Sequence, residues 1–139
     1  MSTPLDPERA AECRGWLVQA ISDLGAAERL GVGDEPFLGQ ALFFCQQTAE
    51  KAIKAFLSWH GKRFRKTHSI EELGEACLAV DSSLRGPIER AAGLTSYVSV
   101  YRYPGAENEP TREEWSAAHQ DAKNLLTAVL AVLPRDVQP

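Results

Sequence analysis

The sequence contains no apolar run approaching the 18 residues that a membrane-spanning helix requires. Its first ten residues lack the basic-then-apolar layout of a signal peptide. Cysteine is scarce, and Cys13, Cys45 and Cys77 lie too far apart for the Cys-x-x-Cys spacing of zinc or redox sites. We therefore expect a cytoplasmic chain that does not enter a membrane and whose cysteines are small buried hydrophobes.

Several catalytic patterns are also missing. There is no phosphate-cradling Gly-rich loop, Walker motif or Ser–His–acid arrangement. None of His60, His68 and His119 has a Glu three residues before it, as the Glu-x-x-His motif of a di-iron bundle requires. The sequence thus predicts no metal site and no cofactor, and it favours a binding module over a metabolic enzyme.

What the sequence does contain is helical periodicity, with apolar residues recurring every three or four positions. Two capping boxes, at Ser69 with Glu72 and at Thr111 with Glu114, mark helix starts, and Gly61 suits a helix end. The segment 95–101 is rich in β-branched and aromatic residues, but its apolar spacing favours a helix over a strand. We expect helices from Pro7 to about Leu30, from a cap at Asp34 with Pro36 in the first turn to Trp59, from Ser69 to about Val80, from Pro87 to about Tyr101, and from Thr111 to Leu133.

These segments and the 139-residue length define the predicted fold class. We predict an all-α protein, an up-and-down antiparallel helical bundle of four to five helices. Residues 1–139 should form a single domain, with a core of about 7–133 and a frayed tail at 134–139.

Charge is distributed unevenly along the chain. The stretch from Lys51 to Ile70 holds six Lys or Arg residues and no acid. It carries +6, which leaves −10 for the rest of a chain whose net charge is −4. This asymmetry predicts one basic face on an otherwise acidic body.

Four ordered segments resemble the HEPN family: Q-Q-T-A-E-K-A-I-K-A at 46–55, K-T-H-S-I at 66–70, Y-R-Y-P-G at 101–105 and T-R-E-E at 111–114. The resemblance covers about residues 10–133. It implies an up-and-down helical bundle, frequently a homodimer. Members similar to this sequence are often encoded beside, or fused to, a minimal nucleotidyltransferase, which implies nucleotide or RNA binding with such a partner.

Other branches of the family are metal-independent ribonucleases of toxin type, as in toxin–antitoxin pairs, and carry Arg-x(4–6)-His. The matching arginine here is Arg102, but positions 107–109 hold Glu, Asn and Glu. Arg63 with His68 falls in the wrong loop. Arg112 and His119 share a face of the last helix and remain the alternative catalytic pair, although chance or structural roles are favoured for them.

Two groups of residues are candidates for binding phosphate. The basic stretch adjoins the start of the third expected helix, whose N–H groups and dipole favour anions. Arg102 lies among tyrosines, and it can bind phosphate through two hydrogen bonds while tyrosines stack on a base. Alternatively, the cations complement a helix dipole and Arg102 belongs to a structural turn. The candidate ligand-binding residues are Lys51, Lys54, Arg65, Lys66, His68, Tyr97, Arg102 and Tyr103.

Three functions follow from these observations. The favoured one is a non-catalytic nucleotide- or RNA-binding module, a homodimer acting with a nucleotidyltransferase. The alternatives are a metal-independent ribonuclease and a pure protein-interaction module.

Overall fold

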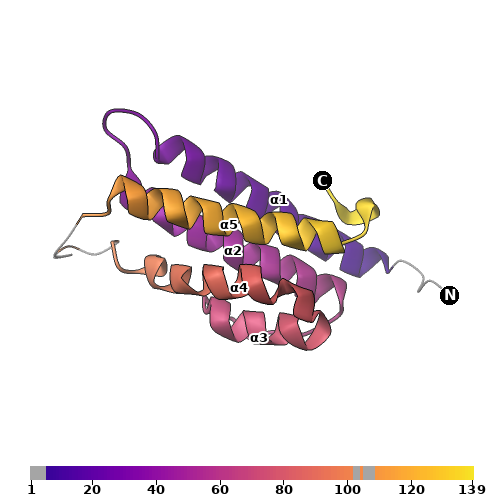
Figure 1. The fold of residues 1–139 in the computed structure, drawn as a ribbon. Helices are drawn as coiled ribbons and strands as arrows, with labels where there is room; N and C mark the ends of the chain where they lie inside the picture. The colour runs from indigo at the N-terminus through magenta and orange to yellow at the C-terminus, as the bar shows by residue number, and fades with distance from the viewer. Residues whose placement is uncertain (1–5, 102–103, 105–108) are drawn as a thin grey trace.

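The computed structural model describes residues 6–101, 104 and 109–139, and these residues form a helical bundle. α1 and α2 form a long antiparallel hairpin, and α5 packs along both of them (Figure 1). α3 packs against α2, and α4 packs against α3 and α5. The α-helices are α1 (Pro7–Leu30), α2 (Leu38–Trp59), α3 (Ile70–Val80), α4 (Arg85–Ala91) and α5 (Arg112–Val132), and the 3₁₀ helices are η1 (Ser82–Leu84), η2 (Ala92–Val98) and η3 (Arg135–Val137).

The all-α fold class is therefore confirmed, with no strand among the described residues. None of the helices formed by these residues is long and apolar enough to cross a membrane. The segment that resembled a strand, residues 95–101, forms no α-helix: residues 95–98 belong to the 3₁₀ helix η2, and residues 99–101 form a turn.

Side-chain and glycine caps fix most helix ends where the sequence predicts them. The Ser69 and Thr111 hydroxyls accept hydrogen bonds from the N–H groups of Glu72 and Glu114 at 3.2 and 3.0 Å. α2 ends at Gly61, whose φ of 65° lies in the left-handed region that only glycine adopts without strain. The following N–H, of Lys62, then donates to the carbonyl of Leu57 at 2.9 Å, as in a Schellman motif.

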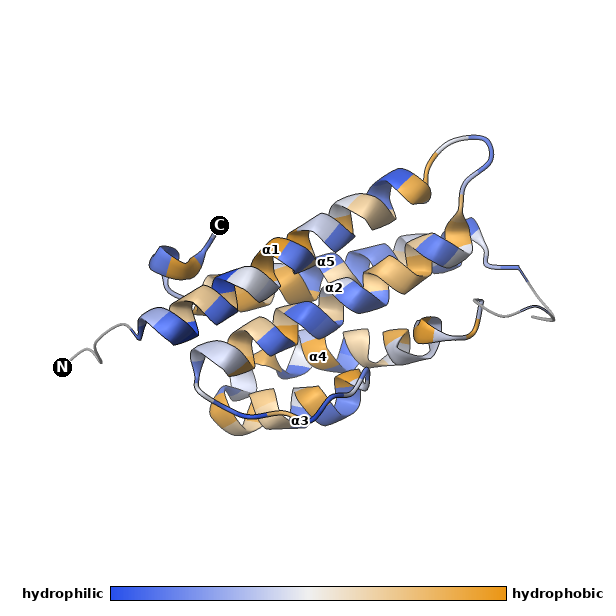
Figure 2. Cartoon of the chain, turned by 180° about the vertical axis from the view of Figure 1, so that it is seen from behind, coloured by the Kyte–Doolittle hydropathy of each residue, from blue (hydrophilic) through white to orange (hydrophobic). Residues whose placement is uncertain are grey.

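One connection departs from the up-and-down order. Residues 61–69, here called the crossover loop, run back along α2, so that α3 points in the same direction as α2 (Figure 2). Gln46 contacts the start of α3 through the His68 carbonyl, and Cys77 near its end contacts the Ile53 carbonyl. An extended chain of this length spans up to about 30 Å, which is enough to return past several turns of helix.

α2 lies at the centre of the bundle and supplies much of its core. Its buried residues run from Ala41 to Ser58 and cover more than one face. The three cysteines are free and fully buried, as predicted. Burial raises the pKa of Cys13 to about 11 and that of Cys45 and Cys77 to about 12, so all three remain neutral thiols near pH 7.

Three predicted boundaries are wrong. α2 begins at Leu38 without a side-chain cap, because the N–H of Phe37 donates back to the Leu30 carbonyl at 2.7 Å and closes the preceding loop. α4 begins at Arg85, and Pro87 occupies its first turn, where an N–H has no intrahelical partner. The expected frayed tail instead forms η3 and buries Val137 completely.

The end of α1 packs closely against α5. Trp115 covers Gly31, and its indole N–H donates to the Ala27 carbonyl at 3.2 Å. A β-carbon at position 31 would overlap the indole ring, whereas one at Gly25 would meet no atom within 4 Å. Alanine substitutions at the two positions therefore separate two effects. At Gly31, the C-cap of α1, the added β-carbon meets the indole ring, and at Gly25, within α1, it changes only the helix propensity.

We predict that Gly31→Ala lowers the free energy of unfolding by about 1–3 kcal/mol, because the indole must be displaced. Gly25→Ala should raise it by about 0.5–1 kcal/mol, because alanine favours the helix and meets no obstacle. Urea denaturation of both variants measures the difference. Equal effects of the two substitutions would contradict the packing of Trp115 on Gly31.

Candidate functional site

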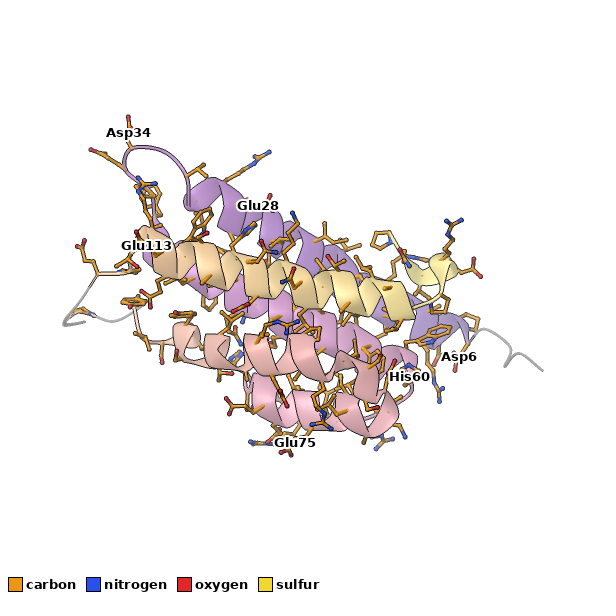
Figure 3. All side chains as sticks on the ribbon, in the orientation of Figure 1. Asp6, Glu28, Asp34, His60, Glu75 and Glu113 are labelled. Carbon is orange, nitrogen blue, oxygen red and sulfur yellow. The ribbon has the colours of Figure 1, made fainter. Side chains whose placement is uncertain are left out.

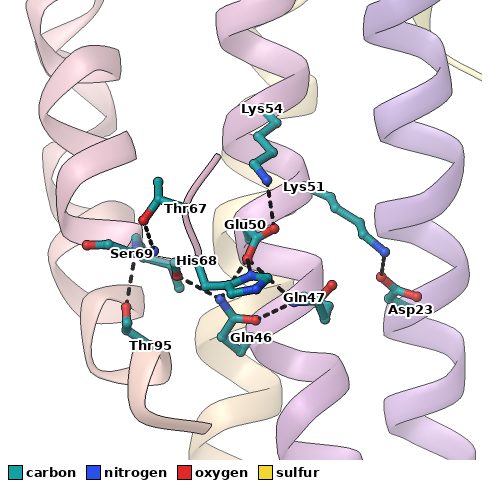
Figure 4. Close-up of polar contacts among 11 residues, drawn as sticks. Asp23, Gln46, Gln47, Glu50, Lys51, Lys54, Thr67, His68, Ser69 and Thr95 are labelled. Atoms are coloured by element: carbon teal, nitrogen blue, oxygen red, sulfur yellow. Dashed lines mark hydrogen bonds and ion pairs between the residues drawn. The ribbon is translucent and has the colours of Figure 1, made fainter. Parts of the chain in front are cut away.

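A buried carboxylate, that of Glu50, is the centre of the polar network at the start of α3 (Figure 4). Its side chain is only 3% exposed. Oε1 accepts hydrogen bonds from Gln46 Nε2 at 3.1 Å and from the His68 ring at 2.8 Å, and Oε2 faces Lys54 Nζ at 2.9 Å. Burial alone would raise the pKa of Glu50, but the hydrogen bonds from Lys54, Gln46 and His68, together with the Lys54 charge, lower it below its ordinary value.

The same network binds the end of the crossover loop to α2. Gln46 Nε2 also donates to the His68 carbonyl at 2.9 Å, and Gln47 Nε2 donates to Gln46 Oε1 at 2.7 Å. Because Nδ1–H of the His68 ring donates its hydrogen bond to Glu50 Oε1, Nε2 of the neutral ring is left as an acceptor, and the side chain is 60% exposed. The sequence pattern flagged His68 as a ligand residue but assigned no role to Gln46, Gln47 or Glu50.

Lys54 extends the network toward two aromatic rings. Its Nζ lies 5.3 Å from the ring centroid of Trp16 on α1 and 5.7 Å from that of Phe64 in the crossover loop. These distances are within the range of cation–π attraction. Lys54 is therefore a buried structural cation that joins α1, α2 and the loop, with a side chain only 9% exposed.

The predicted basic face is partly neutralised by ion pairs. Lys51 Nζ lies 2.6 Å from Asp23 of α1, and Arg65 Nε lies within 3 Å of both carboxylate oxygens of Glu72. Within the basic stretch, three exposed cations make no ion pair with any residue in the described ranges, namely Lys62, Arg63 and Lys66. Cations for a phosphate are thus concentrated in the crossover loop and not on the side of α2.

The tyrosine group lies elsewhere on the bundle. The Tyr97 and Tyr101 hydroxyls both donate to Glu114 at 3.0–3.1 Å. Burial, followed by the Glu114 contact, raises the pKa of both tyrosines above the ordinary value. Arg102 and Tyr103, the other members of this predicted site, lie outside the described residues.

A cavity of about 500 Å³ opens between α1 and the start of the crossover loop. Asp6 and His60, which flank the segments that form it, lie close together at one end of the bundle (Figure 3). Its lining combines cations with the rings of Trp16 and Phe64 and the hydroxyl of Ser58. Neither Trp16 nor Ser58 is a candidate site residue in the sequence, because neither position belongs to a recognisable motif.

A family model of the HEPN domain matches residues 13–132, which is most of the chain. The chain belongs to the HEPN domain family.

Solved structures agree with this assignment. The crystal structure of TT1696 from Thermus thermophilus is 32% identical in sequence, covers 88% of this chain and 98% of its own, and superposes with a TM-score of 0.69. ST0689, described as an archaeal HEPN homologue, is 24% identical, with coverages of 86% and 96% and a TM-score of 0.65, and supports the fold alone. No curated protein matches the chain.

In this HEPN domain, both members of the alternative catalytic pair make structural contacts. His119 Nε2 lies 3.0 Å from Glu28 of α1, and its ring stacks on Trp115 with centroids 5.5 Å apart. Arg112 donates to the Gly33 carbonyl at 2.6 Å. The Glu28 contact of His119 fastens α5 to α1, and the Gly33 contact of Arg112 fastens it to the loop that follows α1. Within the described part of the chain, no group of three His, Cys, Asp or Glu residues is placed to hold a metal ion.

We predict strong energetic coupling between Glu50 and Lys54. Glu50→Leu should lower the free energy of unfolding by about 3–5 kcal/mol, because it leaves the Lys54 ammonium buried without its partner. The double variant Glu50→Leu/Lys54→Met should lose much less than the sum of the two single variants, since it replaces the whole pair with apolar side chains. A double-mutant cycle by chemical denaturation measures the coupling, and additive losses would contradict it.

The pH dependence of the free energy of unfolding provides an independent check on the contribution of Glu50. A lowered pKa means that the contribution of Glu50 is complete above its unfolded pKa, about 4.3, and is lost as pH falls through the native value. The stability difference between the Glu50→Leu variant and the wild type should therefore shrink in acid. A difference that grows below about pH 4 would contradict the assignment.

Proposed function

We propose that this HEPN domain is a non-catalytic, cytoplasmic module that binds nucleotide or RNA through the crossover loop. It acts as a homodimer beside a nucleotidyltransferase partner. The observation that carries the proposal is the row of exposed cations at Lys62, Arg63 and Lys66, which have no acidic partner among the described residues. Phosphate groups supply the charge that such cations lack.

The rigidity of the loop also supports binding. Its first residues are held by the Schellman hydrogen bonds at Gly61 and Lys62, and its last residues by Gln46 and Glu50. A surface fixed at both ends loses little conformational entropy when a ligand binds. Arg65 is oriented by Glu72, and the exposed His68 ring lies at the end of the loop, where Glu50 holds it.

The dimer and the partner protein are inferred from the family resemblance. Val18 and Ile21 support an interface, because they lie one turn apart on α1 and are 50% and 42% exposed. Apolar side chains that are neighbours on an exposed helix face gain free energy when a second chain covers them.

We predict that Lys62→Ala/Arg63→Ala/Lys66→Ala weakens binding of a labelled short single-stranded RNA and flattens its dependence on salt. Each lost phosphate contact lowers the log–log salt slope by about 0.7, so the triple variant should lose about two units. Fluorescence anisotropy at several salt concentrations measures the slope. A matched control, Arg29→Ala/Lys123→Ala/Arg135→Ala, changes the net charge equally, from −4 to −7, at exposed sites outside the loop.

Equal weakening by the control triple would mean that net charge, and not the loop, governs binding, and would contradict the proposal. Absence of RNA and nucleotide binding by the wild type would do the same and favour a pure interaction module. Metal-independent RNA cleavage that disappears in His119→Ala would instead support the ribonuclease alternative.

A further inference from the structure

The cavity between α1 and the crossover loop has the size and lining of a small-molecule site. Its volume of about 500 Å³ lies within the range of about 300–1,000 Å³ that is typical of ligand pockets. Two other cavities are less suited to an anion. One, lined in part by Gly39, Gln40 and Tyr101, has no cation among the described residues of its lining, and the other is smaller and places Glu114 and Asp121 beside Arg90.

The Ser58 hydroxyl is a buried polar group without a partner. Ser58 is 4% exposed and lines the cavity, and its Oγ makes no hydrogen bond with any described residue. Thr48, also on α2, shows the usual alternative, because its hydroxyl donates to the Phe44 carbonyl one turn earlier at 2.8 Å. Because Oγ itself is buried, a ligand in the cavity would supply this missing partner once the Ser58 side chain turns its hydroxyl toward the cavity.

Three cations from two elements converge on the same cavity: Arg9 of α1 and Lys62 and Arg63 of the loop. Gly61 lets the loop backbone approach the Arg9 guanidinium closely, because a β-carbon at position 61 would overlap it and the arginine side chain would have to shift. Among the described residues, Arg9 is paired only with Asp6, at 3.6 Å and with both side chains half-exposed, so most of its donors remain available there. The lining thus favours an anion with several acceptor oxygens.

The other wall of the cavity is aromatic. Trp16 and Phe64 meet edge to face with centroids 6.4 Å apart, and the buried Lys54 ammonium makes cation–π contacts with both rings. Aromatic faces beside cations are the combination that proteins use to stack a base while binding its phosphate. Glu12, also in the lining, offers a carboxylate that accepts hydrogen bonds from sugar hydroxyls.

We propose that this cavity binds one nucleoside 5′-phosphate, with the phosphate on Arg9, Lys62 and Arg63, the base against Trp16 and Phe64, and a hydrogen bond to Ser58. The inference rests on the proposed function and identifies where a single nucleotide is held. A free nucleotide and the 5′-phosphorylated end of an RNA strand share this chemistry.

The test is a calorimetric titration of AMP into the wild type and into two matched pairs of variants. Ser58→Ala should weaken AMP binding about three- to tenfold without lowering the unfolding midpoint, because the hydroxyl has no partner in the folded chain. Ser58→Thr, which keeps the hydroxyl, should bind nearly as the wild type does. Arg9→Gln should weaken binding at least about tenfold, whereas Arg29→Gln, on the same helix outside the cavity, should have no effect.

Competition with short RNAs then identifies the source of the ligand. Displacement of AMP by 5′-phosphorylated RNA but not by 5′-hydroxyl RNA supports the RNA end, and no displacement by either supports a free nucleotide. Wild-type affinity in both Ser58→Ala and Arg9→Gln would overturn the proposed cavity site, as would the absence of AMP and 5′-phosphate binding. If loop-dependent RNA binding persists in that case, the proposed function stands without this site.

Discussion

The buried carboxylate of Glu50 is the interaction on which the arrangement of this end of the bundle depends. A charge removed from water is tolerated only when hydrogen bonds and an opposite charge surround it. Here Lys54 supplies the charge, and Gln46 and His68 supply donors from α2 and from the end of the crossover loop. One acidic side chain therefore couples the central helix to the segment that reverses the chain direction.

This coupling extends from the core to the proposed binding surface. Lys54 lies against Trp16 and Phe64, so the ion pair that neutralises Glu50 also positions the aromatic wall of the cavity. Backbone geometry fixes the crossover loop at Gly61, and Glu50 fixes it at His68. The cations between these two residues therefore lie on a loop whose two ends are held in place. The electrostatics of the core and the proposed binding surface thus belong to one network in this HEPN domain.

Local signals in the sequence predicted the helices well, because capping boxes at Ser69 and Thr111 and the glycine at 61 act within one turn. Tertiary partners were not predictable in the same way. The basic stretch begins at Lys51, one residue after Glu50, and nothing local indicates that Lys54 pairs with that acid or Lys51 with Asp23. The direction of α3 and the burial of Val137 likewise depend on contacts distant in sequence.

The most direct test of the central claim is amide hydrogen exchange in the Glu50→Leu/Lys54→Met double variant, which keeps the net charge and every exposed cation of the loop. Exchange reports local opening of segments whose anchoring contacts are lost. If Glu50 anchors the crossover loop, exchange will accelerate in residues 61–72 and remain as in the wild type in α5. Unchanged exchange in the loop, or an equal acceleration throughout the bundle, would contradict the account.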